Sequence, residues 1–134
     1  MTTTTNYFEG GKMNYENGIL VVNYDQGLII DEKTLYNQMM CRQKLTGNDD
    51  FFMVVNMTNA KDITDEALAL AASNPYPQHV KAIATITRYG MDYTRSKLYS
   101  VFDRPNIKTK AFLSVEAAKE WFDGMEQVSL RKAS

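Results

Sequence analysis

The sequence is poor in the residues that build metal centres, disulfides and nucleophilic active sites. Its 134 residues include one cysteine, Cys41, and one histidine, His79. A disulfide within the chain needs two cysteines, and a structural zinc site needs several Cys or His ligands. A Ser-His-Asp or Cys-His arrangement would depend on His79, which we interpret as an exposed loop residue just before a strand. We therefore expect no metal site, no cofactor and no catalytic set.

The chain also lacks an excess of charge and a long apolar run. Its 15 basic and 16 acidic residues leave a net charge of −1, which creates no field to attract nucleic acid. No apolar run approaches the roughly 20 residues of a membrane span, and residues 1–5 lack the basic and apolar regions of a signal peptide. We predict one cytoplasmic domain over residues 1–134, with no nucleic-acid partner and no membrane insertion.

The N-terminal residues have the pattern of antiparallel strands. Short aromatic-bearing runs flank Gly10 and Gly11, and glycines at both turn positions are typical of a β-hairpin. We assign residues 1–17 to this hairpin. Residues 18–24 form a second, more apolar strand, and residues 28–30 lead to Asp31, a good helix N-cap.

Residues 32 to about 45 have a helical pattern. Four apolar side chains share one predicted stripe, namely Leu35, Tyr36, Met39 and Met40. This assignment places Cys41 on the opposite, peripheral side of the helix, and nothing in its surroundings marks it as reactive.

The centre of the chain is a buried strand that leads through a short polar loop into a helix. Residues 51–55 are continuously apolar, and such a run is typical of a strand covered on both faces. Thr64 then caps a helix with Asp65 and Glu66 in its first turn. Loops of this kind are where α/β proteins usually place their binding residues.

The rest of the chain continues the alternation of strands and helices. We predict a strand at 80–87, a helix at 91–103, a strand at 108–113, and a last helix that Ser114 caps and Gly124 ends. Residues 125–134 form a weakly patterned tail that either adds a turn of helix or frays. This order predicts an α/β fold, in which an N-terminal antiparallel hairpin joins parallel βαβ units packed with about four helices.

These segments resemble the STAS domains, and most closely the small bacterial SpoIIAA-like or STAS/SEC14-like proteins. The strand at 51–56, the connector, the capped helix and the Lys81-Ala82-Ile83-Ala84 strand match their pattern. The final segment from Lys108 to Phe122 is the most specific part of the resemblance. The likeness covers roughly residues 18–124 and implies a SpoIIAA-like sheet and an interaction module.

In STAS antagonists the loop after this strand carries an Asp-Ser-Ser-Gly segment, whose first serine is phosphorylated to switch partner binding. The matching positions here are Thr64, Asp65, Glu66 and Ala67. Asp65 stands at the position of the phosphorylated serine and has no hydroxyl. The resemblance leaves three interpretations: a helix start only, an acid that imitates phosphoserine, or phosphorylation at Thr64.

A second group of candidate residues follows the next strand. Arg88 and the helix N-terminus at Met91 could hold an anion, Tyr89 could stack on a flat group, and Arg95 lies inside an apolar arc. The structural alternatives are a solvated Arg88 and an Arg95 whose stem covers the core.

Three classes of function are compatible with these patterns. The favoured one is a non-enzymatic domain that binds a protein partner, or itself, through the 91–103 helix and a loop; the candidate loop residues are Thr58, Asn59, Asp62, Thr64, Asp65 and Glu66. We also expect a homodimer, because small sheets with exposed edges often pair. The alternatives are a small-ligand or lipid binder of SEC14 type, with its pocket at the carboxyl ends of the parallel strands, and an enzyme using acidic residues of the loop.

Overall fold

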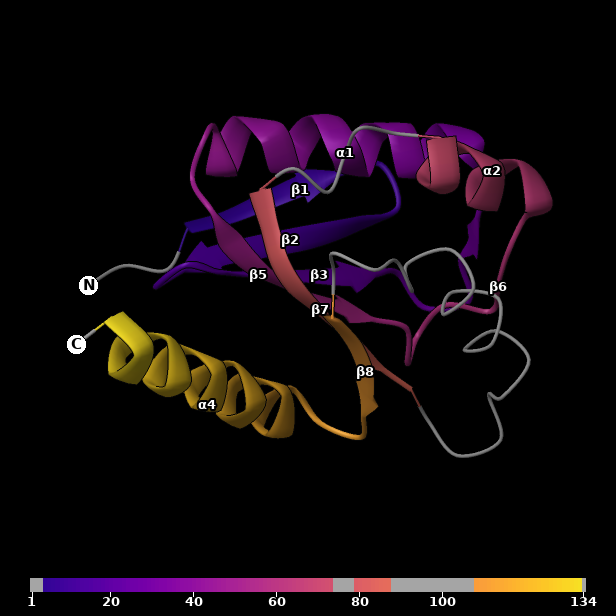
Figure 1. The fold of residues 1–134 in the computed structure, drawn as a ribbon. Helices are drawn as coiled ribbons and strands as arrows, with labels where there is room; N and C mark the ends of the chain where they lie inside the picture. Colours follow the sequence, from indigo (N-terminus) through magenta and orange to yellow (C-terminus); the bar gives the residue numbers. More distant parts are fainter. Residues whose placement is uncertain (1–3, 74–78, 88–107, 134) are drawn as a thin grey trace.

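A computed structural model describes residues 4–73, 79–87 and 108–133 of the chain (Figure 1). The elements in chain order are β1 (Thr4–Phe8), β2 (Gly11–Glu16), β3 (Ile19–Tyr24), β4 (Ile29–Ile30), α1 (Glu32–Thr46), β5 (Phe51–Asn56), β6 (Asp62–Ile63), α2 (Asp65–Ser73), β7 (Val80–Ile86), β8 (Lys108–Phe112) and α4 (Val115–Ala133). The predicted helix at 91–103 lies outside the described residues.

Six of the strands form one mixed sheet in the order β1-β2-β3-β5-β7-β8. The β1–β2 and β2–β3 pairs are antiparallel, whereas β3–β5, β5–β7 and β7–β8 are parallel. The N-terminal hairpin followed by parallel βαβ units is therefore confirmed, and so is the α/β fold class. The carboxyl ends of the four parallel strands all lie at the same edge of the sheet.

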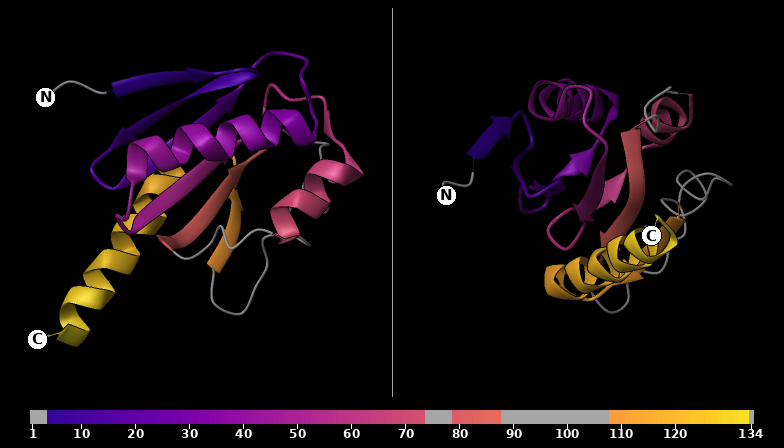
Figure 2. Two further views of the ribbon diagram at one scale, coloured as in Figure 1. Left: turned by 90° about the horizontal axis from the view of Figure 1, so that it is seen from above. Right: turned by 60° about the vertical axis from the view of Figure 1, so that its left-hand side comes forward.

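Helices cover the two faces of this sheet unequally, as Figures 1 and 2 show. Helices α1 and α2 lie on one face, and α4 lies on the other over β5, β7 and β8. We call the buried cluster under α1 and α2 the α1-side core; its members include Met13, Leu20, Val22, Leu35, Phe51, Met53, Val55, Met57, Ala67 and Ile83. The α4-side core consists of Phe52, Val54, Ala82, Ala84, Ile86, Ala118 and Phe122.

Strand β5 contributes to both cores because successive side chains of a strand point to opposite faces. Phe51 and Met53 belong to the α1-side core, whereas Phe52 and Val54 belong to the α4-side core. The Phe52 ring stacks on Phe122 of α4, with the ring centroids 4.5 Å apart. The unbroken apolar run is thus explained by burial on both faces, as predicted.

The β1–β2 hairpin turns one residue earlier than predicted, through Glu9 and Gly10. Gly10 has a φ of 111°, a conformation that side chains rarely adopt. Gly11 is the first residue of β2, and a Cβ there would clash with the backbone carbonyl oxygen of Asn23. The first glycine therefore permits the turn, and the second permits close approach of β3.

Helix α1 begins as predicted, because the backbone N–H of Thr34 donates a 2.8 Å hydrogen bond to the Asp31 carboxylate. This hydrogen bond holds the pKa of Asp31 below its ordinary value, and the nearby Lys33 charge contributes further to the lowering. The cap thus places a charged acceptor at the positive end of the helix.

The predicted apolar stripe of α1 is wrong in part. Tyr36 and Met40 are 54% and 44% exposed, whereas Leu35 is buried and Met39 packs against the α1-side core. Cys41 is not peripheral, because it also packs against that core, and burial raises the pKa of its thiol. Successive residues lie 100° apart around the axis of a helix, so α1 cannot bury both sets of side chains. If α1 were rotated about its axis to bury Tyr36 and Met40, Cys41 and Leu45 would turn away from the core. The residues that α1 buries are Thr34, Leu35, Gln38, Arg42 and Thr46.

Helix α4 is longer than predicted. Gly124 does not end it, and the helix continues to Ala133. Beyond the glycine, Met125 packs against the α4-side core, and the Glu126 carboxylate accepts a 2.8 Å hydrogen bond from Lys81 Nζ. Tertiary contacts on both sides of Gly124 thus outweigh its low helix propensity.

Candidate functional site

Asn56, the last residue of β5, organises the start of the predicted site. Its side-chain Nδ2 donates to Asn23 Oδ1 at 2.9 Å, and its Oδ1 accepts from the backbone N–H and the hydroxyl of Thr58 at 3.1 and 2.8 Å. Asn23 is the register partner of Asn56 on β3. The amide of Asn56 therefore joins the carboxyl ends of two parallel strands to the loop that follows.

Sequence reasoning missed the role of Asn23 and Asn56. Each residue stands near the carboxyl end of an apolar strand. This shared position was the signal from which their contact could have been predicted. The pairing itself depends on the parallel register between β3 and β5, which the local pattern does not specify.

The loop at residues 58–66, which we call the 58–66 loop, is held by backbone hydrogen bonds to the segment before α1. Three of them span its length: Gly27 N–H to Asn59 O, Lys61 N–H to Leu28 O, and Thr64 N–H to Ile30 O, at 2.8, 2.7 and 2.9 Å. The last two flank the small parallel ribbon of β4 and β6, which was not predicted. The loop is therefore a tethered part of the structure.

Thr64 caps α2 as predicted. Its Oγ1 accepts a 3.1 Å hydrogen bond from the backbone N–H of Ala67, and its carbonyl accepts from Leu68 at 3.0 Å. Asp65 and Glu66 in the first turn are exposed, and Ala67 is buried in the α1-side core. The hydroxyl that a kinase would have to modify is thus half-buried and engaged in the cap.

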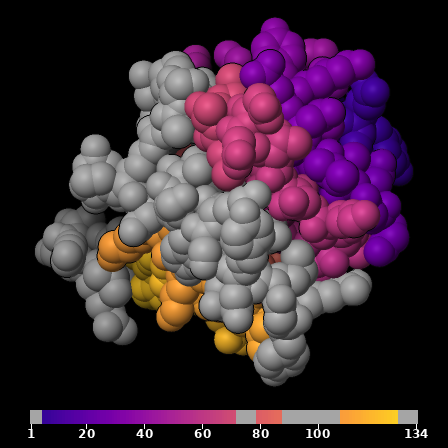
Figure 3. All heavy atoms as spheres, turned by 90° about the vertical axis from the view of Figure 1, so that its right-hand side faces the viewer, coloured from indigo at the N-terminus to yellow at the C-terminus, as the bar shows by residue number. Residues whose placement is uncertain are grey.

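The two carboxylates of the loop differ in their surroundings. Asp62 is half-buried, and its Oδ1 accepts a 2.8 Å hydrogen bond from the backbone N–H of Ile63. Asp65 extends into solvent instead. Figure 3 shows the loop and α2, in pink, as a continuous exposed surface beside α1.

The neighbouring strand ends lie beside this loop. Met57 N–H donates to Ile86 O at 2.8 Å, and Thr87 N–H donates to Phe112 O at 3.2 Å, so the ends of β5, β7 and β8 are adjacent. Ser114 caps α4 by accepting a 3.2 Å hydrogen bond from Ala117 N–H. The predicted residues Arg88, Tyr89 and Arg95 lie outside the described residues.

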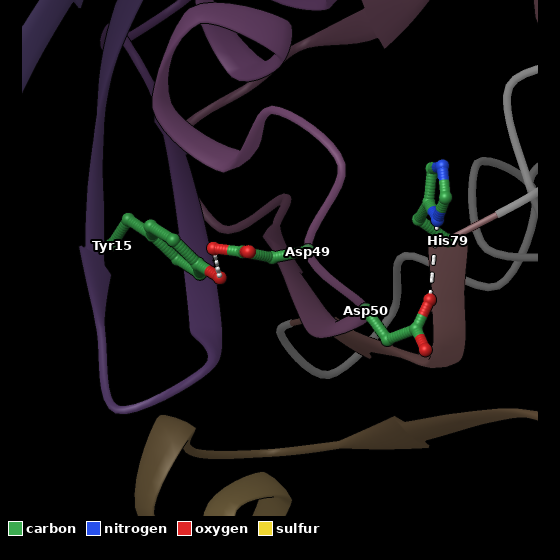
Figure 4. Close-up of polar contacts among 4 residues, drawn as sticks. All are labelled: Tyr15, Asp49, Asp50 and His79. Carbon is green, nitrogen blue, oxygen red and sulfur yellow. Dashed lines mark hydrogen bonds and ion pairs between the residues drawn. The ribbon is translucent and has the colours of Figure 1, made fainter.

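Two polar pairs lie away from this site, at the amino ends of β5 and β7 (Figure 4). Tyr15 Oη donates to Asp49 Oδ2 at 3.3 Å, and burial, followed by the Asp49 charge, raises the pKa of the phenol. His79 Nδ1 lies 3.1 Å from Asp50 Oδ1, and both side chains are well exposed. Among the described residues, no hydrogen bond joins His79 to a hydroxyl or thiol, so this pair forms no nucleophile relay.

A hollow of about 250 Å³ lies on the opposite face of the sheet from α1. Its lining residues are Asn14, Glu16, Asn17, Ile19, Val21, Val115 and Lys119. This position is between β2, β3 and the start of α4, away from the 58–66 loop. Within the described ranges, no group of three His, Cys, Asp or Glu side chains is arranged to hold a metal ion. Nor is any helix there both long and apolar enough to cross a membrane.

Comparisons with known proteins give a family and a fold. A family model described as "Domain of unknown function (DUF7793)" matches residues 13–126. No curated protein matches the sequence. The crystal structure of an uncharacterised protein of the DUF3478 family from Shewanella loihica PV-4, described as having a SpoIIAA-like fold, superposes with a TM-score of 0.60. That similarity covers 88% of this chain and 97% of the other, at 12% identity, and so shows the fold alone.

Proposed function

The chain belongs to the DUF7793 family, and on this basis and that of its SpoIIAA-like fold we propose that it is a non-enzymatic STAS-like domain that binds a protein partner through the 58–66 loop. The first turn of α2 and the predicted helix at 91–103 complete the docking surface in this proposal. The partner surface carries basic side chains that face Asp65 and Glu66.

The observation that carries the proposal is the tethering of the loop. Backbone hydrogen bonds from Gly27, Lys61 and Thr64 fix both ends of the connector to the 27–30 segment. The amide of Asn56 fixes its start through Thr58. A loop already held in one conformation loses little conformational entropy on binding, which favours its use as a docking element.

The charges on this scaffold are available for intermolecular contacts. Asp65 and Glu66 are exposed, and neither makes a hydrogen bond or ion pair with another described residue. Adjacent carboxylates at a helix N-terminus also orient an approaching basic surface by long-range attraction. These features support recognition of a basic protein surface.

In this proposal the loop acts by docking, and its two threonine hydroxyls have structural roles. The Thr58 hydroxyl donates to Asn56 and the Thr64 hydroxyl accepts from the helix backbone, so no described base activates either oxygen. In this proposal Asp65 takes the place of phosphoserine as a permanent negative charge, and Thr64 remains a structural cap.

The small-ligand alternative predicts a pocket at the carboxyl ends of the parallel strands. The hollow described above lies elsewhere, and its volume of about 250 Å³ is below the roughly 300–1,000 Å³ usual for ligand pockets. No observation among the described residues favours this alternative over protein binding.

The proposal is tested by charge reversal with a matched control. Glu116 lies in the first turn of α4 as Glu66 does in α2, and both are exposed. We expect Asp65→Lys to remove partners that the wild type captures from an extract of the source organism, while Glu116→Lys retains them. Loss of a buried interfacial charge pair costs about 2–5 kcal/mol, so a purified partner should bind Asp65→Lys at least about 30-fold more weakly.

Capture of the same partners by all three proteins would refute a role for the loop. If the only co-purifying material were a lipid or another small molecule, the alternative would replace the proposal. Matching unfolding midpoints for the two variants would show that differences in capture come from the surface and not from the fold.

A further inference from the structure

The six-stranded sheet has two outer edges, and only one of them carries charged residues along the strand. β1 and β8 are the outermost strands, and no described residue pairs with the outer side of either. β8 contains Lys108 and Lys110, both exposed, and lysines of this kind prevent strands from pairing edge to edge. β1 has the sequence Thr-Thr-Asn-Tyr-Phe, with no charge and high β propensity. The β1 edge is therefore the one suited to accept another strand.

The hairpin geometry shows which backbone groups of β1 face outward. Phe8 and Gly11 are paired and flank a two-residue turn, so they form a hydrogen-bonded pair. Since hydrogen-bonded and non-hydrogen-bonded pairs alternate, Asn6 also directs its N–H and C=O toward β2. Thr5 and Tyr7 must then direct theirs away from the sheet.

The second hairpin supports this assignment independently. Glu16 and Ile19 flank the two-residue turn at Asn17 and Gly18, so they too form a hydrogen-bonded pair, between β2 and β3. Glu16 thus directs its backbone groups toward β3, and Tyr15 directs its own toward β1. The two turns give the same alternation along β2.

We propose that the β1 edge binds the same edge of a second copy of this chain, antiparallel and about a two-fold axis at Asn6. In this register Thr5 of each copy lies opposite Tyr7 of the other. Both are the outward-facing residues, so the two pairs satisfy the free N–H and C=O groups of each. The two six-stranded sheets become one continuous sheet.

Three features of β1 favour a second copy as the partner. The strand is self-complementary about Asn6, as an isologous interface requires, and no like charges oppose one another. Tyr7 is 78% exposed, and pairing covers its ring. Within the part of the chain that the structure describes, the Asn6 side-chain Nδ2 is buried without a hydrogen-bond partner, and the axis brings the amide of a second Asn6 beside it. In Figure 2, β1 forms the rim of the sheet on the N-terminal side.

The first test measures molecular mass in solution across a concentration series by light scattering and sedimentation. We expect wild type to reach twice the chain mass of 15.3 kDa. Tyr7→Lys places two like charges diagonally across the axis and should weaken the dimer at least about tenfold. The matched control is Tyr36→Lys on α1, where tyrosine is also exposed, and it should leave the dimer unchanged. A monomeric wild type, or a dimer that Tyr7→Lys leaves intact, would overturn the proposal.

The second test uses disulfide formation at the axis, in a Cys41→Ser background so that no other thiol is present. Only a residue on the two-fold axis meets its own copy, and non-hydrogen-bonded antiparallel partners have Cα atoms about 4.5 Å apart, within the range for a disulfide. Asn6→Cys should therefore form a covalent dimer under mild oxidation. Lys110→Cys, at the centre of the other edge strand, should not. The opposite outcome for this pair would identify β8 as the interface, and neither test depends on the 58–66 loop.

Discussion

Two amide side chains in the molecule, Asn56 and Gln38, differ in how well their polar atoms are paired. Asn56 uses its Nδ2 and Oδ1 in three hydrogen bonds that join β3, β5 and the 58–66 loop. Gln38 is 1% exposed, its Nε2 reaches the Tyr24 hydroxyl only at 3.5 Å, and its Oε1 has no partner among the described residues. A buried acceptor without a donor costs about 1–3 kcal/mol. Asn56 thus stabilises the site, whereas the unpaired oxygen of Gln38 lowers the stability of the protein on the buried side of α1.

Replacing Gln38 with methionine should stabilise the protein. The two side chains are similar in shape and helix propensity, and methionine has no acceptor to leave unpaired. We expect Gln38→Met to raise the free energy of unfolding by about 1 kcal/mol in urea denaturation. Gln43→Met, on the exposed side of the same helix, is the control and should change it by less than about 0.5 kcal/mol. A loss of stability in Gln38→Met relative to this control would show that Oε1 is paired.

At the scale of elements, α4 shows how contacts in three dimensions extend a helix beyond a local stop signal. Gly124 is exposed, and a Cβ added there would meet no described atom within 4 Å apart from its chain neighbours and the backbone of its own helix. The helix continues through it because Met125 and Glu126 make contacts with the rest of the protein. Glycine at this position lowers the stability of the helix without serving a turn.

Two glycine-to-alanine substitutions, one in a helix and one in a turn, should change the stability of the protein in opposite directions. Gly124→Ala should raise the free energy of unfolding by about 1 kcal/mol, because alanine loses less backbone entropy in a helix. Gly18 also has open space around its Cβ position, but its φ is 76°. Gly18→Ala should therefore lower the free energy of unfolding by about 1–2 kcal/mol. Calorimetry or denaturant titration of both variants checks the opposite signs; equal signs would contradict the backbone explanation.

On the scale of the whole molecule, the two cores share the strands β5 and β7 but differ in size. The α1-side core includes residues from both helices on its face, whereas the α4-side core depends on a few large side chains around Phe122. β5 belongs to both. Because β5 cannot leave one core without disturbing the other, we expect the two faces of the sheet to unfold together.

Removing the Phe122 ring tests this coupling. The ring is 1% exposed and stacks on Phe52, so Phe122→Ala should cost about 3–5 kcal/mol of unfolding free energy. Leu113→Ala is the control, since Leu113 is 61% exposed and should cost less than about 1 kcal/mol. Tryptophan fluorescence reports the α4 side, where Trp121 lies, and the reactivity of the Cys41 thiol reports the α1 side. Separate transitions by the two probes would show that the faces unfold independently.

Local signals in the sequence were sufficient for the order of the six main strands and for the starts of α1, α2 and α4, but not for the β4–β6 ribbon. The apolar run before Asn56 indicated a strand buried on both faces, because only such a strand can hide five consecutive apolar side chains. Asp31, Thr64 and Ser114 were correctly identified as caps, because a cap depends on backbone groups only a few residues away. The position of the 58–66 loop followed from the same reasoning.

Only the tertiary structure decided which side chains of those elements meet. The buried face of α1, with Gln38 and Arg42 inward and Tyr36 and Met40 outward, depends on where β1, β2 and α2 lie around the helix. The tethering of the loop likewise depends on residues 27–30, about thirty positions earlier in the chain. The sequence by itself determined the main strands and the starts of α1, α2 and α4, because those interactions are local. The arrangement around the loop and the position of β1 at the edge of the sheet arise from contacts between distant segments, which no short pattern encodes.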